Sequence, residues 1–504
     1  MKKYDLLKVL GIAFLILVVL SWIIVPGSLA SGQFVKGEGT TPLGLFDLFR
    51  LPVVTIGSCF QYGIIVLLIG GFYGVLNKTG VYEKIVEGLS KKFNGKEKKF
   101  LIITMLMFIL LSSLTGLTWV LFIIVPFIAA VLLMMGFNKI TTLAATVGSI
   151  LIGLMGATYG FGINGFIINL FEINVNYQIV TKVVFLLVIT VLYVGFVTMM
   201  ATIIKENKPT KKEVAKKTST KSTTSKKEDK TKKEEKPKEE IKESLDIPLF
   251  IKGEAKDKST WPLIIISIFM ILLLLFGMYN FFYSFEIEVF QKFHTNLTEF
   301  TIGGYAIFAK LLGNVSAIGY WGNYELAVIL IFATILISLI YGIKFKDMMD
   351  GFVTGVKQML KPAFYTVIAS IIFVFLVTSG TGNSICDTIV NWILSFSKDF
   401  NAFFTSLAAG VGSLFYNDFY YLVYSVTGYY TTAITSASTL GVIGIIYQAI
   451  YGLFMLFLPT SIILIAGLSY LDVSYKEWLK YIWKLLLILF VAIIIVIVIV
   501  ALMV

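Results

Sequence analysis

Long apolar stretches, repeated from one end of the chain to the other, constrain this sequence more than any other feature. A helix of about 20 apolar residues spans the hydrocarbon core of a bilayer, where only helices and closed barrels satisfy their backbone polar groups. The alternating short strands of a β-barrel are missing from the sequence. Composition agrees, because 57% of the 504 residues are hydrophobic and only 14% are charged. Uninterrupted stretches that predict membrane spans cover residues 9–25, 61–77, 179–204, 262–283, 324–343, 361–379 and 482–503.

Four further apolar segments are interrupted by hydroxyl residues, amides, glycine or proline. A spanning helix that is interrupted in this way is typical of membrane transporters. We therefore predict an all-α polytopic membrane protein with about nine full spans, two re-entrant hairpins and two broken helices. The hairpins are predicted at residues 100–136 and 400–440, and the broken helices at residues 141–170 and 441–470.

The same order of elements occurs in both halves of the chain, which indicates an internal repeat. The loop at residues 78–99 carries seven lysines, whereas its counterpart at residues 380–400 carries only Lys398. Lys-rich loops stay in the cytoplasm, so the equivalent loops lie on opposite faces and the repeats are inverted. The predicted organisation is a first repeat (1–204), a linker (205–258), an extra span with an external segment (262–323) and a second repeat (324–504).

The lysine-rich loops also support the re-entrant hairpins. If both interrupted segments crossed the membrane once, the linker and the lysines at 476–484 would fall on the external face. Hairpins that return to their own face place every Lys-rich loop, the linker and the N-terminus in the cytoplasm. The abundance of Lys, Ile, Phe, Tyr and Asn beside a single Arg indicates an AT-rich bacterial genome, so we expect a multi-pass protein of the bacterial cytoplasmic membrane. The alternative for the first apolar stretch is a signal peptide cleaved after residues 28–30.

The linker at residues 205–258 accounts for half of the net charge of +12, because it holds 18 lysines against 12 acidic residues. It has almost no aromatic residues and cannot bury a core, so we predict a disordered cytoplasmic segment. The alternative is a basic arm that binds nucleic acid or anionic lipid. The interleaved glutamates weaken the local field, and we expect no nucleic-acid partner.

Several kinds of chemistry are excluded by residue counts. Two cysteines cannot build a disulfide framework, one histidine cannot build a multi-His metal centre, and one arginine cannot build a clamp of several guanidinium groups. The run from Gly160 to Gly165 fits GxGxxG, but no strand precedes it. No phosphate loop is present either, so transport would be driven by an ion gradient or by exchange, and we expect neither an enzyme nor an organic cofactor.

The four interruptions are the candidate functional positions. A break in a membrane helix frees backbone N–H and C=O groups, which a bound solute or ion can satisfy. Small and hydroxyl residues at a single break often serve close packing instead, as we expect for Gly70, Gly71 and Gly74. Four breaks at symmetric positions favour a common solute site near the midplane. The predicted solute- and ion-binding residues are Ser112, Ser113, Thr115, Gly116, Gly156, Thr158, Asn164, Ser413, Asn417, Asp418, Pro459, Thr460 and Ser461.

Asp418 is the most informative of these residues. A carboxylate inside an apolar stretch is costly unless it is paired or bound to a cation, so Asp418 is predicted to hold Na⁺, relay a proton or bind an amino group. The alternative is that its segment is shallow and Asp418 faces water. The breaks contain no Lys or Arg, which favours an amino acid or another amine-bearing solute over a dicarboxylate.

Several short runs make the chain resemble the YfcC family, which is grouped with the anaerobic four-carbon dicarboxylate carriers in the ion-transporter superfamily. The resemblance covers most of the chain except the linker and residues 284–323. It rests on Pro42–Asp47 (PLGLFD), Ile69–Gly80 (IGGFYGVLNKTG), Gly156–Thr158 (GAT), Leu458–Ser461 (LPTS) and Lys476–Lys480 (KEWLK).

The resemblance implies inverted repeats, two hairpins and elevator motion of a transport unit against a scaffold. It implies Na⁺ coupling through hairpin tips that map to Ser112, Ser113, Thr115, Ser413 and Asn417, and it assigns the Pro-Thr-Ser break to residues 459–461. With Asp418 added, the expected Na⁺ ligands are Ser113, Thr115, Asn417 and Asp418; H⁺ is the alternative coupling ion. Related scaffolds often dimerise, so a homodimer embedded in lipid is expected.

The sequence also departs from the family pattern. Leu117, Thr118 and Trp119 stand where acidic residues usually follow the first tip, and Tyr416–Tyr421 replaces a Ser/Gly-rich second tip. The resemblance thus predicts fold better than solute. We predict a secondary transporter of a small organic solute, either an amino acid or a carboxylate. The alternatives are a dicarboxylate carrier or a basic amino acid antiporter within that class, and a passive channel or a membrane enzyme using Asp418 outside it.

Overall fold

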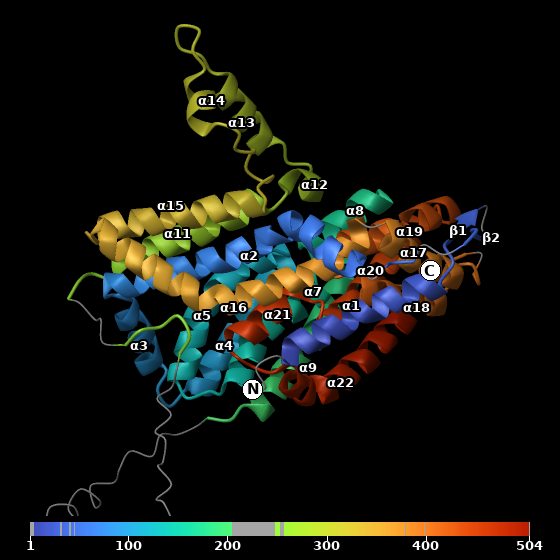
Figure 1. Ribbon diagram of the computed structural model, residues 1–504, viewed down its shortest axis with the longest axis horizontal. Helices are drawn as coiled ribbons and strands as arrows, with labels where there is room; N and C mark the ends of the chain where they lie inside the picture. Colours follow the sequence, from blue (N-terminus) through green and yellow to red (C-terminus); the bar gives the residue numbers. More distant parts are fainter. Residues whose placement is uncertain are drawn as a thin grey trace, which may run out of the picture.

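The computed structural model describes residues 5–30, 33–39, 42–44, 46–203, 247–252, 257–378, 380–397, 399–502 and 504. Most of the predicted linker, and Lys398, lie outside these residues. Nearly all of the described elements are helices, apart from one antiparallel hairpin of β1 (Gly27–Ala30) and β2 (Gln33–Lys36) in which Gly27 pairs with Lys36 (Figure 1). The predicted all-α polytopic membrane class is confirmed.

Peripheral spans form the outside of the bundle. Each begins and ends within a few residues of a predicted apolar stretch, except that α22 begins seven residues earlier. They are α1 (Asp5–Ile23), α9 (Ile179–Met200), α11 (Trp261–Met278), α15 (Asn323–Ile340) and α22 (Tyr475–Ala501). Eight helices in the described part of the chain are long and apolar enough to cross a membrane, and only 22% of the α11 window is buried by protein, so its surface suits lipid contact.

The molecule is organised around two long helices, α2 (Asp47–Thr79) and α16 (Phe345–Thr378), which pack along each other (Figure 1). The spans predicted at 61–77 and 361–379 begin earlier in the structure, because residues 47–60 and 345–360 form the first turns of these helices. Their close approach depends on two Gly-x-x-x-Gly pairs. A Cβ on Gly70 would lie 2.6 Å from the carbonyl oxygen of Gly355, and a Cβ on Gly74 would overlap the backbone of Gly351.

Both predicted hairpins double back. In the first, α4 (Glu97–Thr115) ends in Gly116, whose positive φ of 69° turns the chain, and α5 (Thr118–Met134) returns to contact α3 (Tyr82–Lys92), the helix that precedes α4. In the second, α18 (Ala402–Phe415) and α19 (Phe419–Ala433) follow α17 (Gly380–Leu394), and the hydroxyl of Tyr430 donates to Oγ1 of Thr405 at 3.0 Å. Late α19 is therefore beside early α18, as a re-entrant hairpin requires.

Both predicted broken helices are interrupted where the sequence indicated. The first consists of α6 (Lys139–Leu143), the π-helical segment η1 (Ala144–Gly148) and α7 (Ser149–Met155), then a break at residues 156–160, then η2 (Phe161–Gly165) and α8 (Phe166–Phe171). The second consists of α20 (Ala437–Met455), a break at residues 456–461 and α21 (Ile462–Tyr470). Helix α20 is the most enclosed span, with 83% of its apolar window buried, so the breaks lie inside protein.

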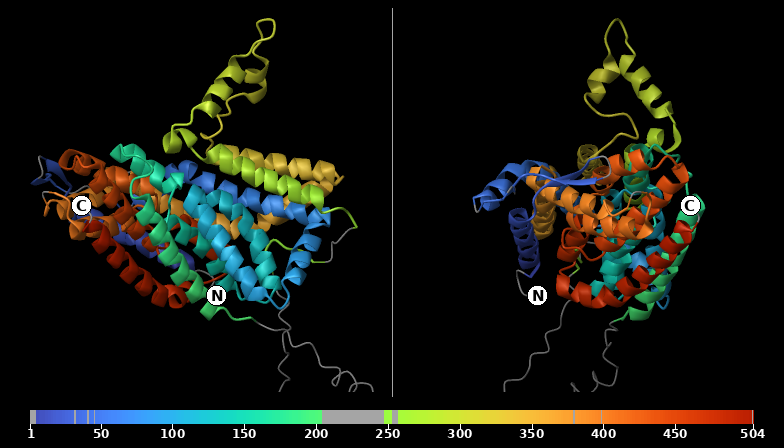
Figure 2. Two further views of the ribbon diagram at one scale, coloured as in Figure 1. Left: turned by 180° about the vertical axis from the view of Figure 1, so that it is seen from behind. Right: turned by 90° about the vertical axis from the view of Figure 1, so that its right-hand side faces the viewer.

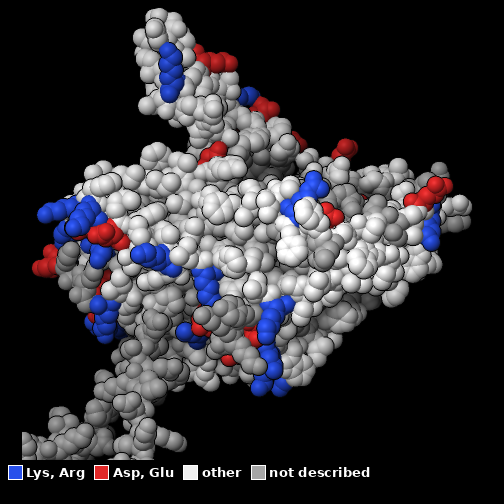
Figure 3. Space-filling view, in the orientation of Figure 1, with Lys and Arg blue, Asp and Glu red and all other residues white. Residues whose placement is uncertain are grey.

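The extra segment between α11 and α15 forms an arm that stands away from the bundle (Figures 1 and 2). It contains α12 (Phe281–Phe285), α13 (Val289–Glu299) and α14 (Ile307–Leu312). On the face drawn in Figure 3, the described Lys and Arg residues gather mainly at one end and along the lower edge, and a wide uncharged surface lies between. Such a surface is suited to lipid.

Candidate functional site

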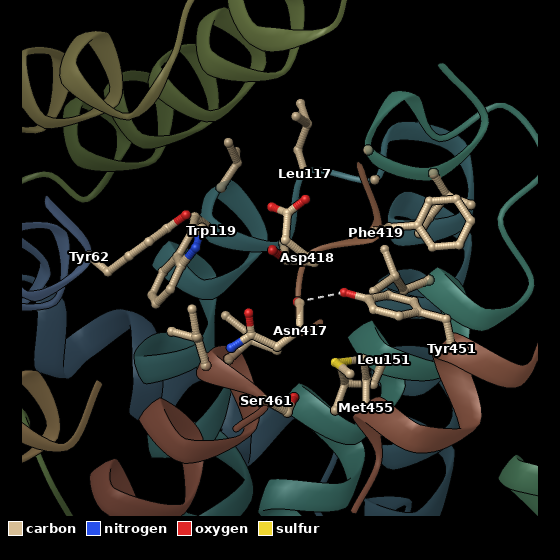
Figure 4. Close-up of a pocket in the computed structure, with 18 of the residues that line it drawn as sticks. Tyr62, Leu117, Trp119, Leu151, Asn417, Asp418, Phe419, Tyr451, Met455 and Ser461 are labelled. Carbon is tan, nitrogen blue, oxygen red and sulfur yellow. Dashed lines mark hydrogen bonds between the residues drawn. The ribbon is translucent and has the colours of Figure 1, made fainter. Parts of the chain in front are cut away.

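A pocket of about 270 Å³ lies where the two hairpin tips meet the two helix breaks (Figure 4). The first tip contributes residues 116–120 and the second contributes Asn417, Asp418 and Phe419. The first broken helix contributes Gly162 and Ile163, and the second contributes residues 461–463. All four interruptions that we identified in the sequence therefore reach one pocket.

Four helices begin at this pocket, which gives it a common electrostatic character. The residues that line it include the first turns of α5, α19, η2 and α21. The first backbone N–H groups of a helix lack intrahelical acceptors and carry partial positive charge. The pocket is consequently surrounded by helix ends that favour a negatively charged group.

Asp418 is the carboxylate that lines the pocket, and it also caps α19. Its Oδ1 accepts a hydrogen bond from the backbone N–H of Tyr420 at 2.9 Å. Figure 4 shows the carboxylate beside Leu117 and Trp119, and the residue is only partly buried. Asp418 therefore forms part of the pocket wall, and its second carboxylate oxygen is in reach of a bound group.

Ser113 joins the first tip to the first break. Its carbonyl accepts the N–H groups of Thr158 (3.1 Å) and Gly160 (2.9 Å), and its hydroxyl donates to the carbonyl of Gly156 at 2.8 Å. The Oγ1 of Thr158 is 3.1 Å from the same hydroxyl. Gly116 allows the close fit, since a Cβ there would lie 2.7 Å from the nitrogen of Gly162. The tip and the break therefore form one structural unit.

The carbonyl groups that the first break exposes are already bound by protein donors. The side-chain amide of Gln448 donates to the carbonyls of Met155 (3.0 Å) and Ala157 (2.8 Å). The amide of Asn164 donates to Ala157 (2.9 Å) and to Thr158 (2.7 Å). We therefore find these carbonyls engaged rather than open to an ion.

A buried lysine stands behind this break. Lys182 in α9 is 4% exposed, and its Nζ donates to Oδ1 of Asn164 at 2.8 Å. The breaks themselves contain no Lys or Arg, and Lys182 of a neighbouring helix does not line the pocket but reaches the first break through Asn164. Its signal in the sequence was a lone charge inside the predicted span 179–204.

The second tip and the second break are joined differently. The Nδ2 of Asn417 donates to the carbonyl of Thr460 at 2.5 Å, and the hydroxyl of Tyr451 donates to the carbonyl of Asn417 at 2.7 Å. Two buried oxygens, Oδ1 of Asn417 and Oγ1 of Thr460, have no hydrogen-bond partner among the described residues. Buried polar atoms are nearly always paired, so these two oxygens indicate a place for a bound ion or water.

The other predicted site residues do not line the pocket. Three of them use their hydroxyls within the protein: Ser112 donates to Ile150, Thr115 to Leu111 and Ser413 to Ala409, with distances of 2.7, 2.7 and 2.6 Å to the carbonyl oxygens. Pro459 and Gly156 lie in the breaks but do not line the pocket. The sequence missed three aromatic residues that line the pocket, Tyr62, Trp119 and Tyr451. Tyr62 of α2 stacks on Trp119 with ring centroids 5.6 Å apart, and Tyr451 contacts Phe419 at 5.1 Å.

Comparisons with known proteins cover nearly the whole chain. The family model of DcuC, the C4-dicarboxylate anaerobic carrier, matches residues 53–502. Among solved structures, the YdaH transporter of Alcanivorax borkumensis aligns over 98% of this chain and 97% of its own, with 12% sequence identity and a TM-score of 0.31. No curated protein matches the chain.

Proposed function

Because the chain belongs to the C4-dicarboxylate anaerobic carrier family, we propose that it carries a small carboxylate, of the size of a four-carbon dicarboxylate, across the bacterial cytoplasmic membrane. It is a multi-pass secondary transporter and not an enzyme. The relationship to the anaerobic four-carbon dicarboxylate carriers that the sequence runs indicated is confirmed. The solute, the coupling ion and the movement are the parts that we propose.

The convergence of four helix N-termini on one pocket is the observation that supports an anionic solute. Backbone N–H groups of the first turns of α5, α19, η2 and α21 surround a space of about 270 Å³. Each such end stabilises an anion by about 0.3–1 kcal/mol when exposed and more when it is partly buried. Lys182 places a basic side chain behind the first break, where its Nζ donates to Oδ1 of Asn164 at 2.8 Å.

An amino acid is the second candidate, and Asp418 favours it. A zwitterion would place its carboxylate at the helix ends and its amino group at Asp418, which lines the same pocket. The sequence preference for an amine rested on the absence of Lys and Arg from the breaks, and Lys182, which donates to Asn164 of the first break, weakens that reason. A basic amino acid has a net positive charge that the four helix ends disfavour, so a carboxylate ranks first.

We propose Na⁺ as the coupling ion, bound at the second break. Na⁺ takes oxygen ligands, and Oδ1 of Asn417 and Oγ1 of Thr460 have no hydrogen-bond partner among the described residues. They belong to two residues that are joined by a hydrogen bond from Nδ2 of Asn417 to the backbone carbonyl of Thr460. Asp418, the next residue, supplies a negative charge that a cation would balance. Ser113 and Thr115, the other predicted Na⁺ ligands, hold their hydroxyls on backbone carbonyls.

We further propose that both hairpins and both broken helices move together against the long helices α2 and α16, as in an elevator. The N-terminus and the linker would lie in the cytoplasm, where their lysines are retained. A homodimer is the arrangement we expect for the scaffold, as the family resemblance implies.

The test is uptake into proteoliposomes that contain the purified protein. We expect saturable uptake of a labelled four-carbon dicarboxylate, accumulation driven by an inward Na⁺ gradient, and counterflow against unlabelled solute. Asn417→Ala and Thr460→Val should raise the Na⁺ concentration needed for half-maximal uptake, and Asp418→Asn should abolish accumulation. Ser413→Ala, whose hydroxyl donates to its own helix, is the matched control.

Three outcomes would contradict the proposal. Flux that rises linearly with concentration and never accumulates solute would indicate a passive channel. If amino acids compete for uptake and dicarboxylates do not, the solute is an amino acid rather than a dicarboxylate. Normal Na⁺ dependence of uptake in the Asn417→Ala and Thr460→Val variants would show that the second break does not bind the coupling ion.

A further inference from the structure

A second cavity, separate from the solute pocket, lies among five helices near one face of the bundle. It has a volume of about 500 Å³ and is bounded by α2, α3, α4, α5 and α11. Its walls are apolar side chains, and Ser267, Tyr73 and Tyr82 are the lining residues that carry a hydroxyl. The Tyr73 hydroxyl donates to the carbonyl of Ile123 at 2.8 Å and is thereby satisfied. We call this cavity the apolar groove.

The length of the apolar groove matches one leaflet of a bilayer. Along α11 its lining runs from Leu263 to Leu275, which at ~1.5 Å per residue is about 18 Å. Half of the hydrocarbon core is about 15 Å thick. Helix α11 is one of the least buried spans of the described chain, so its surroundings at this depth are lipid chains rather than water.

One end of the groove coincides with a membrane interface. Nζ of Lys84 in α3 donates to Oδ1 of Asp257, four residues before α11, at 3.1 Å, so the start of α11 lies beside α3. Tyr82 and Ile85 of α3 line the groove at this end. Trp261, the first residue of α11, is 68% exposed, as expected of a tryptophan at the headgroup level.

We propose that the apolar groove binds one phospholipid molecule. An acyl chain lies along Ile271 and Leu275, and the headgroup lies at the end of the groove near Trp261. This occupant fills the hydrocarbon-lined space of the groove and keeps its polar part at the membrane interface. A peptide would leave its backbone groups unpaired against these walls, and the lining offers no charge for a soluble ligand.

The site has a consequence for the first hairpin, if the proposed function holds. Ile123 and Phe127 of α5 line the groove, while the first turn of the same helix lines the solute pocket. A bound lipid is then the surface against which this hairpin moves. Lipid binding itself is independent of transport and can be measured without it.

The experiment is native mass spectrometry of the full-length protein, purified in mild detergent and washed to remove loosely bound lipid. We expect one phospholipid per protomer to remain. Ile271→Trp fills the groove and should lower the retained lipid at least tenfold. Phe269→Trp is the matched control, because Phe269 is 64% exposed on the same helix and does not line the groove.

A second measurement uses the unaltered protein and so does not depend on the folding of a variant. A phospholipid with a photoreactive acyl chain, added to membranes, should label peptides of α11 and α5. Equal lipid retention in the Ile271→Trp and Phe269→Trp variants would overturn the proposal. So would retention of detergent or free fatty acid in place of phospholipid, or labelling spread evenly over all the spans.

Discussion

At the scale of single residues, the sequence located the polar groups of the breaks but not all of their partners. Four residues that were predicted from the interrupted apolar segments line the pocket: Gly116, Asn417, Asp418 and Ser461. Lys182 and Gln448 could not be assigned in this way, because a lone polar residue in a span does not indicate which neighbouring helix its side chain faces. Their role follows only from how the helices pack.

Lys182 gives the first prediction. Lys182→Met removes the buried charge and leaves Oδ1 of Asn164 without a donor, whereas Lys182→Gln removes the charge but keeps a donor. If the charge stabilises a bound anion, both variants should raise the KM for a dicarboxylate about tenfold, equivalent to ~1.4 kcal/mol. Uptake kinetics in proteoliposomes measure this effect.

Thermal unfolding separates the charge from the hydrogen bond. Lys182→Met should be less stable than Lys182→Gln, because an unsatisfied buried acceptor costs about 1–3 kcal/mol. A normal KM in both variants would show that the ammonium acts only in packing the break.

At the scale of elements, hydrophobic runs predicted the helices well and their starts less well. Apolar length fixed α1, α9, α11 and α15 to within a few residues, since the requirement to span lipid is local. The early start of α2 was missed because the span was predicted from the uninterrupted apolar stretch at 61–77 alone, whereas the helix begins at Asp47 and contains Pro52. The π-helical segment η1 has no sequence signal that we recognise.

The contact between α2 and α16 gives the second prediction. Gly74→Ala should destabilise the protein by about 1–3 kcal/mol, because its Cβ overlaps the backbone of Gly351 and the two helices must separate. Gly195→Ala in α9 is the control, since a Cβ there meets open space and alanine favours a helix. Thermal unfolding in detergent measures both, and equal midpoints would mean that the close approach contributes nothing.

At the scale of the whole molecule, the repeated order of elements could be predicted from the sequence. How these elements pack together in space could be predicted only in part. Spacing alone predicted that four breaks share one site, and the structure brings all four to one pocket. The opposite orientation of the two repeats stays a prediction from the lysine distribution. The apolar groove and the stacked pair Tyr62–Trp119 had no signal, because they combine helices that are distant in sequence.

The Tyr62–Trp119 contact gives the third prediction, because it joins α2 to the tip of the first hairpin. In a protein with Cys59 and Cys386 replaced, cysteines at positions 62 and 119 joined by a short bifunctional thiol reagent should stop transport reversibly. Solute binding should persist. A matched pair at Thr405 and Tyr430, within one hairpin, should leave transport intact when joined. Normal transport by the joined 62–119 pair would contradict movement of the hairpin against α2.

Gln448 belongs to α20, yet its amide holds the carbonyls of Met155 and Ala157 on the other side of the chain's midpoint. A Cβ on Gly452, one turn further along, would meet the Cβ and Cα of Met155, so the two broken helices are also in direct backbone contact. Neither broken helix can therefore shift by itself. Whatever displacement delivers cargo from one side to the other must carry both broken helices as one rigid body.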